Sequence, residues 1–247
     1  MTNRHYGFLG QAAIFGAYAF VPFVNRYGLQ RQMSLSDDLD QIRERGSAND
    51  KIRLAYESVV DQLGRAETAG RALKVGDIMP IFVLPNSEGR LVFSDDLLRQ
   101  GPLVVNFFRG NWCPYCRRTL EALETALPTI EGAGGHLVAL TPDTGEHFAE
   151  TKRQRGLSYE ILSDVDGAIG LQFGVLFRAP ERYRALLIDL GIDLEERHGN
   201  AGWFIPIPAT FVVEQSGVIR YAFVNVDFTR RAEPEEVVDV LRGLSGR

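Results

Sequence analysis

Short apolar runs alternate with helical patterns of apolar residues along the chain from about residue 75 onward. Residues 103–108 form a nearly continuous apolar run, which is typical of a central strand buried on both faces. A helical pattern at 113–130 follows it directly. Further strands are predicted at 81–84, 91–93, 136–140, 159–162, 209–214 and 218–226, and further helices at 146–155, 168–173 and 235–244. This alternation predicts an α/β sandwich with a mixed central sheet flanked by helices.

Two helices are expected ahead of this domain, in a helical extension at residues 33–74. Ser34, with Asp37 three positions later, is typical of a helix N-cap. The second helix is the clearer, because its apolar residues fall on one face at helical spacing. These residues are Ile52, Tyr56, Val59, Val60, Leu63 and Ala66. The main domain would then span 75–247 and hold an insertion at about 175–208, with a helix at 181–190, that we expect to shape substrate access.

The first 32 residues form an apolar extension that has several alternative interpretations. Residues 6–24 contain no formal charge, and residues 12–24 are almost wholly apolar. The segment is compatible with a short membrane span, although glycines and a proline interrupt it. It is also compatible with a signal peptide cleaved after 17–19, with a natural start at Met33, or with a tail that docks on the domain. We expect a cytoplasmic protein, with a signal or membrane anchor as the alternative.

Composition narrows the range of partners. Hydrophobic residues make up 45% of the 247 residues, which is enough for an ordinary buried core. The formal net charge is −5, and acidic and basic residues are spread along the chain. This argues against nucleic acid as the main partner.

The chain has two cysteines, Cys113 and Cys116, in the sequence Trp112-Cys113-Pro114-Tyr115-Cys116. A pair so close in sequence closes too small a loop to constrain the unfolded chain much. Reactivity therefore explains the pair better than stabilisation of the fold does. A zinc site would need two further ligands, and none of the four histidines has a matching spacing. No metal is expected.

The two cysteines open the helix that follows the central strand. At a helix N-terminus, unpaired N–H groups and the helix dipole favour negative charge, so a thiolate is stabilised there and its pKa falls. Arg109, Arg117 and Arg118 add positive charge in the same region. Pro114 suits the first helical position, because it has no N–H that needs a partner. The sequence thus predicts an activated cysteine.

A second feature is Pro208, directly before the strand expected at 209–214. A proline there, often preceded by a cis bond, would bring backbone beside the dithiol and present an edge for a substrate. Thr210 is expected to face the dithiol. Other conspicuous residues have ordinary interpretations. Arg230 and Arg231 are expected in a solvated loop, Asp164 and Asp166 in a turn and cap, and Trp203 and Phe204 in packing of the insertion.

At these residues the chain resembles the peroxiredoxin-like, AhpC/TSA-type branch of the thioredoxin superfamily, over about residues 75–244. Shared features are Val75-Gly76-Asp77 with Pro80 and Phe82, the strand ending at Phe108, Trp112 to Cys116, Leu162-Ser163-Asp164, Phe173-Gly174-Val175, and Pro208 to Val213. The resemblance implies reduction of hydrogen peroxide or organic hydroperoxides without a bound cofactor. A thiolate would become a sulfenic acid, condense with the second thiol to a disulfide, and be restored by an external dithiol.

Two departures from that family affect the assignment of roles. Its usual Pro-x-x-x-Thr/Ser-x-x-Cys pattern would make Cys116 the attacking cysteine, with Cys113 at the Thr/Ser position and Arg109 at the proline. The arginine that such enzymes carry before the later strand aligns with Pro208, unless Arg109 or Arg117 substitutes for it. The thioredoxin and glutaredoxin pattern instead makes Cys113 the nucleophile, Cys116 the resolving thiol and Pro208 the cis-proline. The division of roles between the cysteines stays open.

The leading hypothesis is a thiol-dependent peroxidase with a thioredoxin- or glutaredoxin-type reductant. The alternatives are a general disulfide oxidoreductase, and a redox sensor whose disulfide switches a partner surface. A homodimer is possible. Cys113 and Cys116 are the expected catalytic pair, supported by Arg109, Trp112, Arg117, Pro208 and Thr210.

Overall fold

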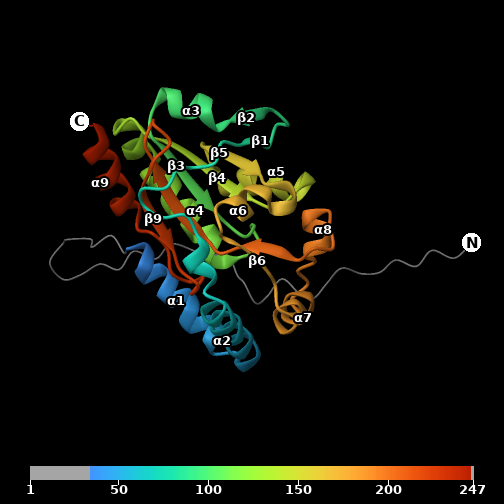
Figure 1. The fold of residues 1–247 in the computed structure, drawn as a ribbon. Coiled ribbons are helices and arrows are strands. Elements are labelled where there is room, and N and C mark those ends of the chain that lie inside the picture. Colours follow the sequence, from blue (N-terminus) through green and yellow to red (C-terminus); the bar gives the residue numbers. More distant parts are fainter. Residues whose placement is uncertain (1–33, 246–247) are drawn as a thin grey trace, which may run out of the picture. The chain divides into compact units, whose positions relative to one another are not determined.

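The computed structural model describes residues 34–245, and the expectations for residues 1–32 and for a start at Met33 lie outside this range. Its centre is a five-stranded sheet with the strand order β5-β4-β3-β8-β9 (Figure 1). The strands are β3 (Leu103–Phe107), β4 (His136–Thr141), β5 (Glu160–Ser163), β8 (Ala209–Val213) and β9 (Ile219–Val224). Strands β3, β4 and β5 are parallel, whereas β8 is antiparallel to both β3 and β9. The predicted mixed sheet is confirmed.

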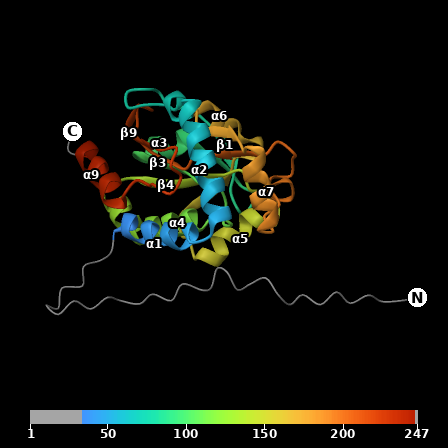
Figure 2. The same ribbon diagram turned by 90° about the horizontal axis from the view of Figure 1, so that it is seen from below.

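Helices cover both faces of the sheet, as Figure 2 shows. One face is covered by α4 (Pro114–Gly132), α5 (Gly145–Arg155) and α9 (Pro234–Ser245). The other face is covered by α3 (Ser94–Gln100), α6 (Ala168–Gln172) and the hairpin of β1 (Val83–Pro85) and β2 (Leu91–Phe93). All five residues of β3 are buried, as its apolar sequence requires. Its alternate side chains enter the two cores, with Val104 on the α4 side and Val105 on the other.

The expected helical extension is present as α1 (Leu35–Ser47) and α2 (Asp50–Arg65), followed by the 3-10 turn η1 (Thr68–Arg71). Ser34 caps α1 as predicted, since its hydroxyl accepts from the Asp37 N–H while the Asp37 carboxylate accepts from the Ser34 N–H. The carboxylate of Glu233 accepts hydrogen bonds from two further N–H groups of α1, those of Leu35 (3.0 Å) and Ser36 (2.7 Å). The extension is therefore bound to the segment that precedes α9.

The insertion contains more structure than its sequence pattern indicated. It forms the hairpin of β6 (Leu176–Arg178) and β7 (Phe204–Pro206), the expected helix as α7 (Glu181–Asp189), and the short α8 (Leu194–His198). The 3-10 turn η2 (Val165–Gly167) precedes it. Apolar residues of α2 and of the insertion share a third core. This core includes Val59, Leu63, Phe177, Tyr183, Leu187, Trp203, Ile205 and Phe228.

Most predicted elements are found within a few residues of their expected bounds. Helix α3, helix α8 and strands β6 and β7 were not predicted, because each is short and lacks a clear period. Asp164 is the N-cap residue of η2, and its carboxylate accepts from the N–H groups of Ile169 and Gly170 in α6. Trp203 is buried as expected, but Phe204 is 43% exposed and packs little. Among residues 34–245, no helix is long and apolar enough to cross a membrane.

If the extension is an integral part of the domain, Leu63→Ala will destabilise the whole described unit. Leu63 is 5% exposed in the core shared by α2 and the insertion, so the substitution should cost about 2–5 kcal/mol. Urea unfolding followed by circular dichroism measures this as one cooperative transition at a lower midpoint. The control is Leu54→Ala, a position on α2 that is 41% exposed and should change little. A separate early transition for the extension would contradict the prediction.

Candidate active site

The two cysteines lie where the sequence placed them, at the start of the helix that follows the central strand. Cys113 is the N-cap of α4, Pro114 is in its first turn, and Cys116 lies in that same turn. Both cysteines are free, with exposed fractions of 2% for Cys113 and 0% for Cys116. The N–H groups of the first turn and the helix dipole therefore act on two sulfurs that water barely reaches.

The loop that joins β3 to α4 is tightly packed and depends on Gly110. This glycine has φ = +133°, in the region that side chains disfavour. A Cβ added to it would lie 2.6 Å from Nε1 of Trp112 and 2.7 Å from Oδ2 of Asp143. Asp143 is itself fully buried, and its carboxylate accepts from Arg197 at 3.2 Å (Nε to Oδ1) and 2.5 Å (Nη2 to Oδ2). The dithiol loop is thus held against the insertion, which supplies Arg197 from α8.

Two N–H donors reach the sulfur of Cys116. The backbone N–H of Arg109 donates to it at 3.5 Å, and Nη2 of Arg231 donates to it at 3.7 Å. Both arginines are buried, with exposed fractions of 0% for Arg109 and 8% for Arg231. Two cations thus lie in the interior next to the dithiol.

This electrostatic setting shifts the pKa values of the two thiols in opposite directions. Burial opposes a charge on Cys113, but the hydrogen bond from Cys116 and the positive charges of Arg109 and Arg231 outweigh it, so the pKa of Cys113 falls well below its ordinary value. Burial and the adjacent Cys113 raise the pKa of Cys116 well above its ordinary value. The N–H contacts to Cys116 alone would suit a thiolate there. We assign the charge to Cys113, because Cys116 then remains the thiol that donates to it, and the pair holds one negative charge.

The structure corrects the expectation that Arg231 lies in a solvated loop, because its side chain is buried. Its Nη1 donates to the carbonyl oxygens of Phe228 and Arg230, which turns the guanidinium inward. Residues around it are fixed by the extension: the Tyr56 hydroxyl bonds to Asp227, and the Tyr56 ring packs edge-on against Phe228 at 4.7 Å. The only sequence signal was that this loop leads from a sheet strand into a helix on the dithiol face.

The supporting residues predicted from sequence are only partly brought together. Arg109 and the partly buried Trp112 adjoin the dithiol, and the Arg109 guanidinium lies 5.5 Å from the centre of the Trp112 ring. Arg117 is partly buried on α4, and the cations that act on the thiols are Arg109 and Arg231 instead. Arg118 pairs with Asp38 of α1.

The region around Pro208 differs from the thioredoxin pattern. Ala209 is paired with Phe107, so Pro208 lies at the end of the sheet from which the dithiol loop leaves. It is buried, and residues 34–245 contain no cis peptide bond, so the expected cis-proline is not found. Thr210 alternates with Val212, which packs on the α4 side of the sheet, and its hydroxyl donates to Oδ1 of Asn106 at 3.1 Å. That Thr210 faces the dithiol stays a prediction.

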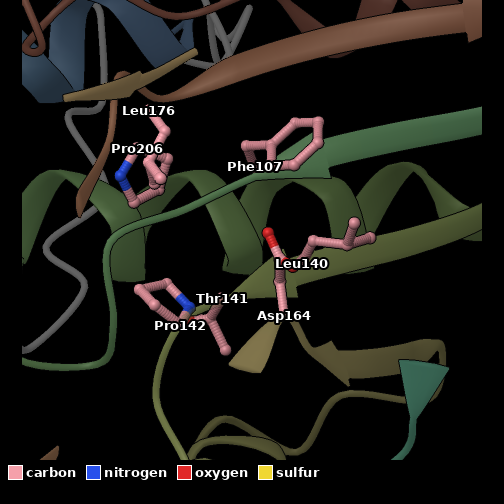
Figure 3. Close-up of a pocket in the computed structure, with 7 residues that line it drawn as sticks. All are labelled: Phe107, Leu140, Thr141, Pro142, Asp164, Leu176 and Pro206. Carbon is pink, nitrogen blue, oxygen red and sulfur yellow. The ribbon is translucent and has the colours of Figure 1, made fainter. Parts of the chain in front are cut away.

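Two cavities lie near this end of the domain. The first, shown in Figure 3, lies between residues of β3, β4, β6 and β7, and it leaves no room for a water molecule. The second is a recess of about 400 Å³ between α1, β9 and the segment before α9. Its lining includes Leu39, Phe223, Thr229, Arg230 and Arg231. Arg231 therefore lines this recess and also contacts the sulfur of Cys116. Residues 34–245 contain no group of three or more metal-ligating side chains placed to hold a metal ion.

Comparison with known proteins identifies the family. The model of the AhpC/TSA family matches residues 75–222, and the chain belongs to this family. Peroxiredoxin Bcp of Escherichia coli is 31% identical over 103 residues, which cover 42% of this chain and 65% of that protein. The crystal structure of Peroxidoxin BcpB from Mycobacterium tuberculosis aligns with a TM-score of 0.55 at 21% identity, covering 70% of this chain and 98% of that one. Peroxiredoxin 6 of Arenicola marina aligns with a TM-score of 0.54 at 17% identity, covering 68% and 72%. The predicted thioredoxin-like fold is confirmed.

The close contacts around Gly110 predict that Gly110→Ala destabilises the domain. An alanine would combine an unfavourable φ with contacts under 3 Å to Trp112 and Asp143, so we expect a loss of roughly 1–3 kcal/mol in unfolding free energy. Urea unfolding checks the loss. Gly243→Ala on α9, where an added Cβ meets nothing within 4 Å, is the control and should be neutral or slightly stabilising. Equal stability of the two variants would show that the loop is looser than described.

Proposed function

We propose that this chain is a thiol-dependent peroxidase that reduces hydrogen peroxide or organic hydroperoxides through a dithiol–disulfide cycle of Cys113 and Cys116. The observation that carries the proposal is the buried cysteine pair at the start of α4, with the guanidinium groups of two arginines beside it. Membership of the AhpC/TSA family and similarity to Peroxiredoxin Bcp support peroxide as the substrate class.

The first step is attack of the Cys113 thiolate on one oxygen of the peroxide. The sulfur forms a bond to that oxygen while the O–O bond breaks, which gives a sulfenic acid and an alkoxide or hydroxide that takes up a proton. The lowered pKa keeps Cys113 in its reactive thiolate form at neutral pH. Cys116, whose raised pKa keeps its proton, is the resolving thiol.

The second step closes the disulfide, and the third reopens it. The Cys116 sulfur displaces water from the sulfenic acid to form the Cys113–Cys116 disulfide. An external dithiol then transfers two electrons by exchange and restores both thiols. We infer a thioredoxin-type donor, with a glutaredoxin-type donor as the alternative. A cytoplasmic location and a homodimer stay predictions.

Arg231 and Arg109 supply the positive charge that the family's usual arginine would provide. Negative charge develops on the leaving oxygen during attack, and fixed donors in a water-poor site stabilise such charge strongly. At the usual position of that arginine this chain has Pro208, which offers no charge. We expect the peroxide to approach through the recess, because Arg231 is part of its lining and contacts the dithiol.

A general disulfide oxidoreductase is the second candidate. The assignment of the charge to Cys113, at the N-cap of α4, favours it, because the thioredoxin pattern uses the first cysteine as nucleophile. The burial of both sulfurs in the reduced dithiol argues the other way, since a protein disulfide would have to reach a thiolate that is at most 2% exposed. A small peroxide meets less obstruction.

The reaction of hydrogen peroxide with wild type, Cys113→Ser and Cys116→Ser distinguishes the attacking cysteine from the resolving one. The reduced proteins are mixed with peroxide in a stopped-flow instrument, and the fluorescence of Trp112 is followed. Fast oxidation should persist in Cys116→Ser, which stops at the sulfenic acid, and disappear in Cys113→Ser. The reverse pattern would make Cys116 the attacking thiol. If no form reacts faster than a free thiol does, the peroxidase proposal fails.

Arg231→Met should slow peroxide reduction by about 10²-fold or more, the typical effect of removing one donor to a developing oxyanion. The same stopped-flow assay, in which the reduced protein is mixed with peroxide, measures the rate of oxidation. Arg242→Met is the control, because that arginine is 63% exposed on α9 and pairs with Asp239 on the same helix. Similar rates in the two variants would remove Arg231 from the mechanism.

A further inference from the structure

Arg109 is a buried cation in an unusual environment. Its guanidinium lies among four aromatic rings, with ring centres at 4.0 Å (Phe228), 5.2 Å (Tyr183), 5.5 Å (Trp112) and 6.0 Å (Phe177). Aromatic faces attract a cation but do not neutralise its charge. Its Nε and Nη2 atoms are buried and have no hydrogen-bond partner among the described residues.

Neither buried arginine has an acidic partner in the described part of the chain. No carboxylate of residues 34–245 forms an ion pair with Arg109 or with Arg231. Glu233, which is close in sequence to Arg231, accepts from the N–H groups of α1 instead. A buried charge is strongly unfavourable when nothing compensates it. No carboxylate in this range therefore balances either charge directly, and an anion at the dithiol would compensate both.

The groups near Arg109 that can become anionic are Tyr183, Cys113 and Cys116. Burial raises the pKa of Tyr183, so its hydroxyl stays neutral. Burial likewise raises the pKa of Cys116. The Cys113 thiolate is the remaining anion, and it lies in the field of both arginines.

We infer that the thiolate of the dithiol is the counter-ion of Arg109 and Arg231, so that oxidation to the disulfide leaves two buried cations without an anion and makes this disulfide a strong oxidant. The inference rests on the proposed function only in taking Cys113 and Cys116 as the disulfide pair. It adds that the folded protein itself favours the reduced state, so that common low-molecular-weight thiols can reset it.

Two thiol molecules lose two electrons and form one disulfide, while the Cys113–Cys116 bond accepts those electrons. Of the two protons that the thiols lose, one stays on Cys116 and one enters solvent, because Cys113 remains a thiolate. Stabilisation of that thiolate shifts the equilibrium toward the reduced protein, as in other strongly oxidising dithiol proteins.

The loss of the buried anion on oxidation should also lower the thermal stability of the protein. A disulfide normally stabilises a fold by constraining the unfolded chain, although a loop this short gains little. Here the reduced form gains the ion pairs that the oxidised form lacks. The oxidised protein should therefore melt at a lower temperature than the reduced protein.

Equilibration with mixtures of reduced and oxidised glutathione tests the inference without any peroxide. Thiols are trapped by alkylation, and mass spectrometry gives the reduced fraction of wild type, Arg109→Met and Arg184→Met. Arg184 is the matched control, because its guanidinium also lies over an aromatic ring, that of Trp203 at 5.8 Å, away from the dithiol. Arg109→Met should shift the equilibrium at least tenfold toward the disulfide, which is about 30 mV in potential.

Arg184→Met should leave the equilibrium within twofold of wild type. An Arg109→Met equilibrium equal to that of wild type would overturn the inference, whatever the peroxidase assay shows. Should Arg109→Met fold poorly, thermal melting of the wild type decides the question: an oxidised form that melts at or above the reduced form overturns the inference. Slow peroxide turnover with the expected shift in equilibrium would instead count against the proposed function alone.

Discussion

The site depends on holding a negatively charged sulfur in the interior of the domain. An isolated anion there would be strongly unfavourable, so the surrounding structure has to supply positive charge and N–H donors. The first turn of α4 supplies the N–H groups and its dipole, the loop after β3 supplies Arg109, and the segment before α9 supplies Arg231. Two neighbouring segments, the loop after β3 and the first turn of α4, thus meet the distant segment before α9 at two sulfurs.

The extension and the insertion have a clear place in this arrangement. The extension fixes the segment before α9 through Tyr56 and through Glu233, and so holds Arg231 against Cys116. The insertion supplies Phe177 and Tyr183 to the aromatic surroundings of Arg109, and its Arg197 binds Asp143 beneath the dithiol loop. Both segments help to enclose the thiols, and this favours a small substrate over a large one.

The sequence predicted the sheet, its main helices, the cap at Ser34 and the position of both cysteines, because these depend on local periodicity and on residues next to one another. It did not predict Arg231, which contacts a sulfur 115 positions away along the chain. It also missed Asp143 and Arg197, since an ion pair between a loop and the short helix α8 leaves no periodic signal. Pro208 was placed at the correct end of the sheet, but not with the expected cis bond.

A titration of the thiolate in the reduced protein tests the central claim most directly, by ultraviolet absorbance with Cys113→Ser as the blank. A folded-state pKa below the ordinary value of about 8.5 means that the thiolate is already formed at neutral pH and is lost only as the pH falls through the lowered value. We therefore predict about one thiolate per chain at pH 7, absent in Cys113→Ser, which disappears only in acid. A thiolate that forms only near the ordinary pKa would contradict the claim that Arg109 and Arg231 hold a buried anion.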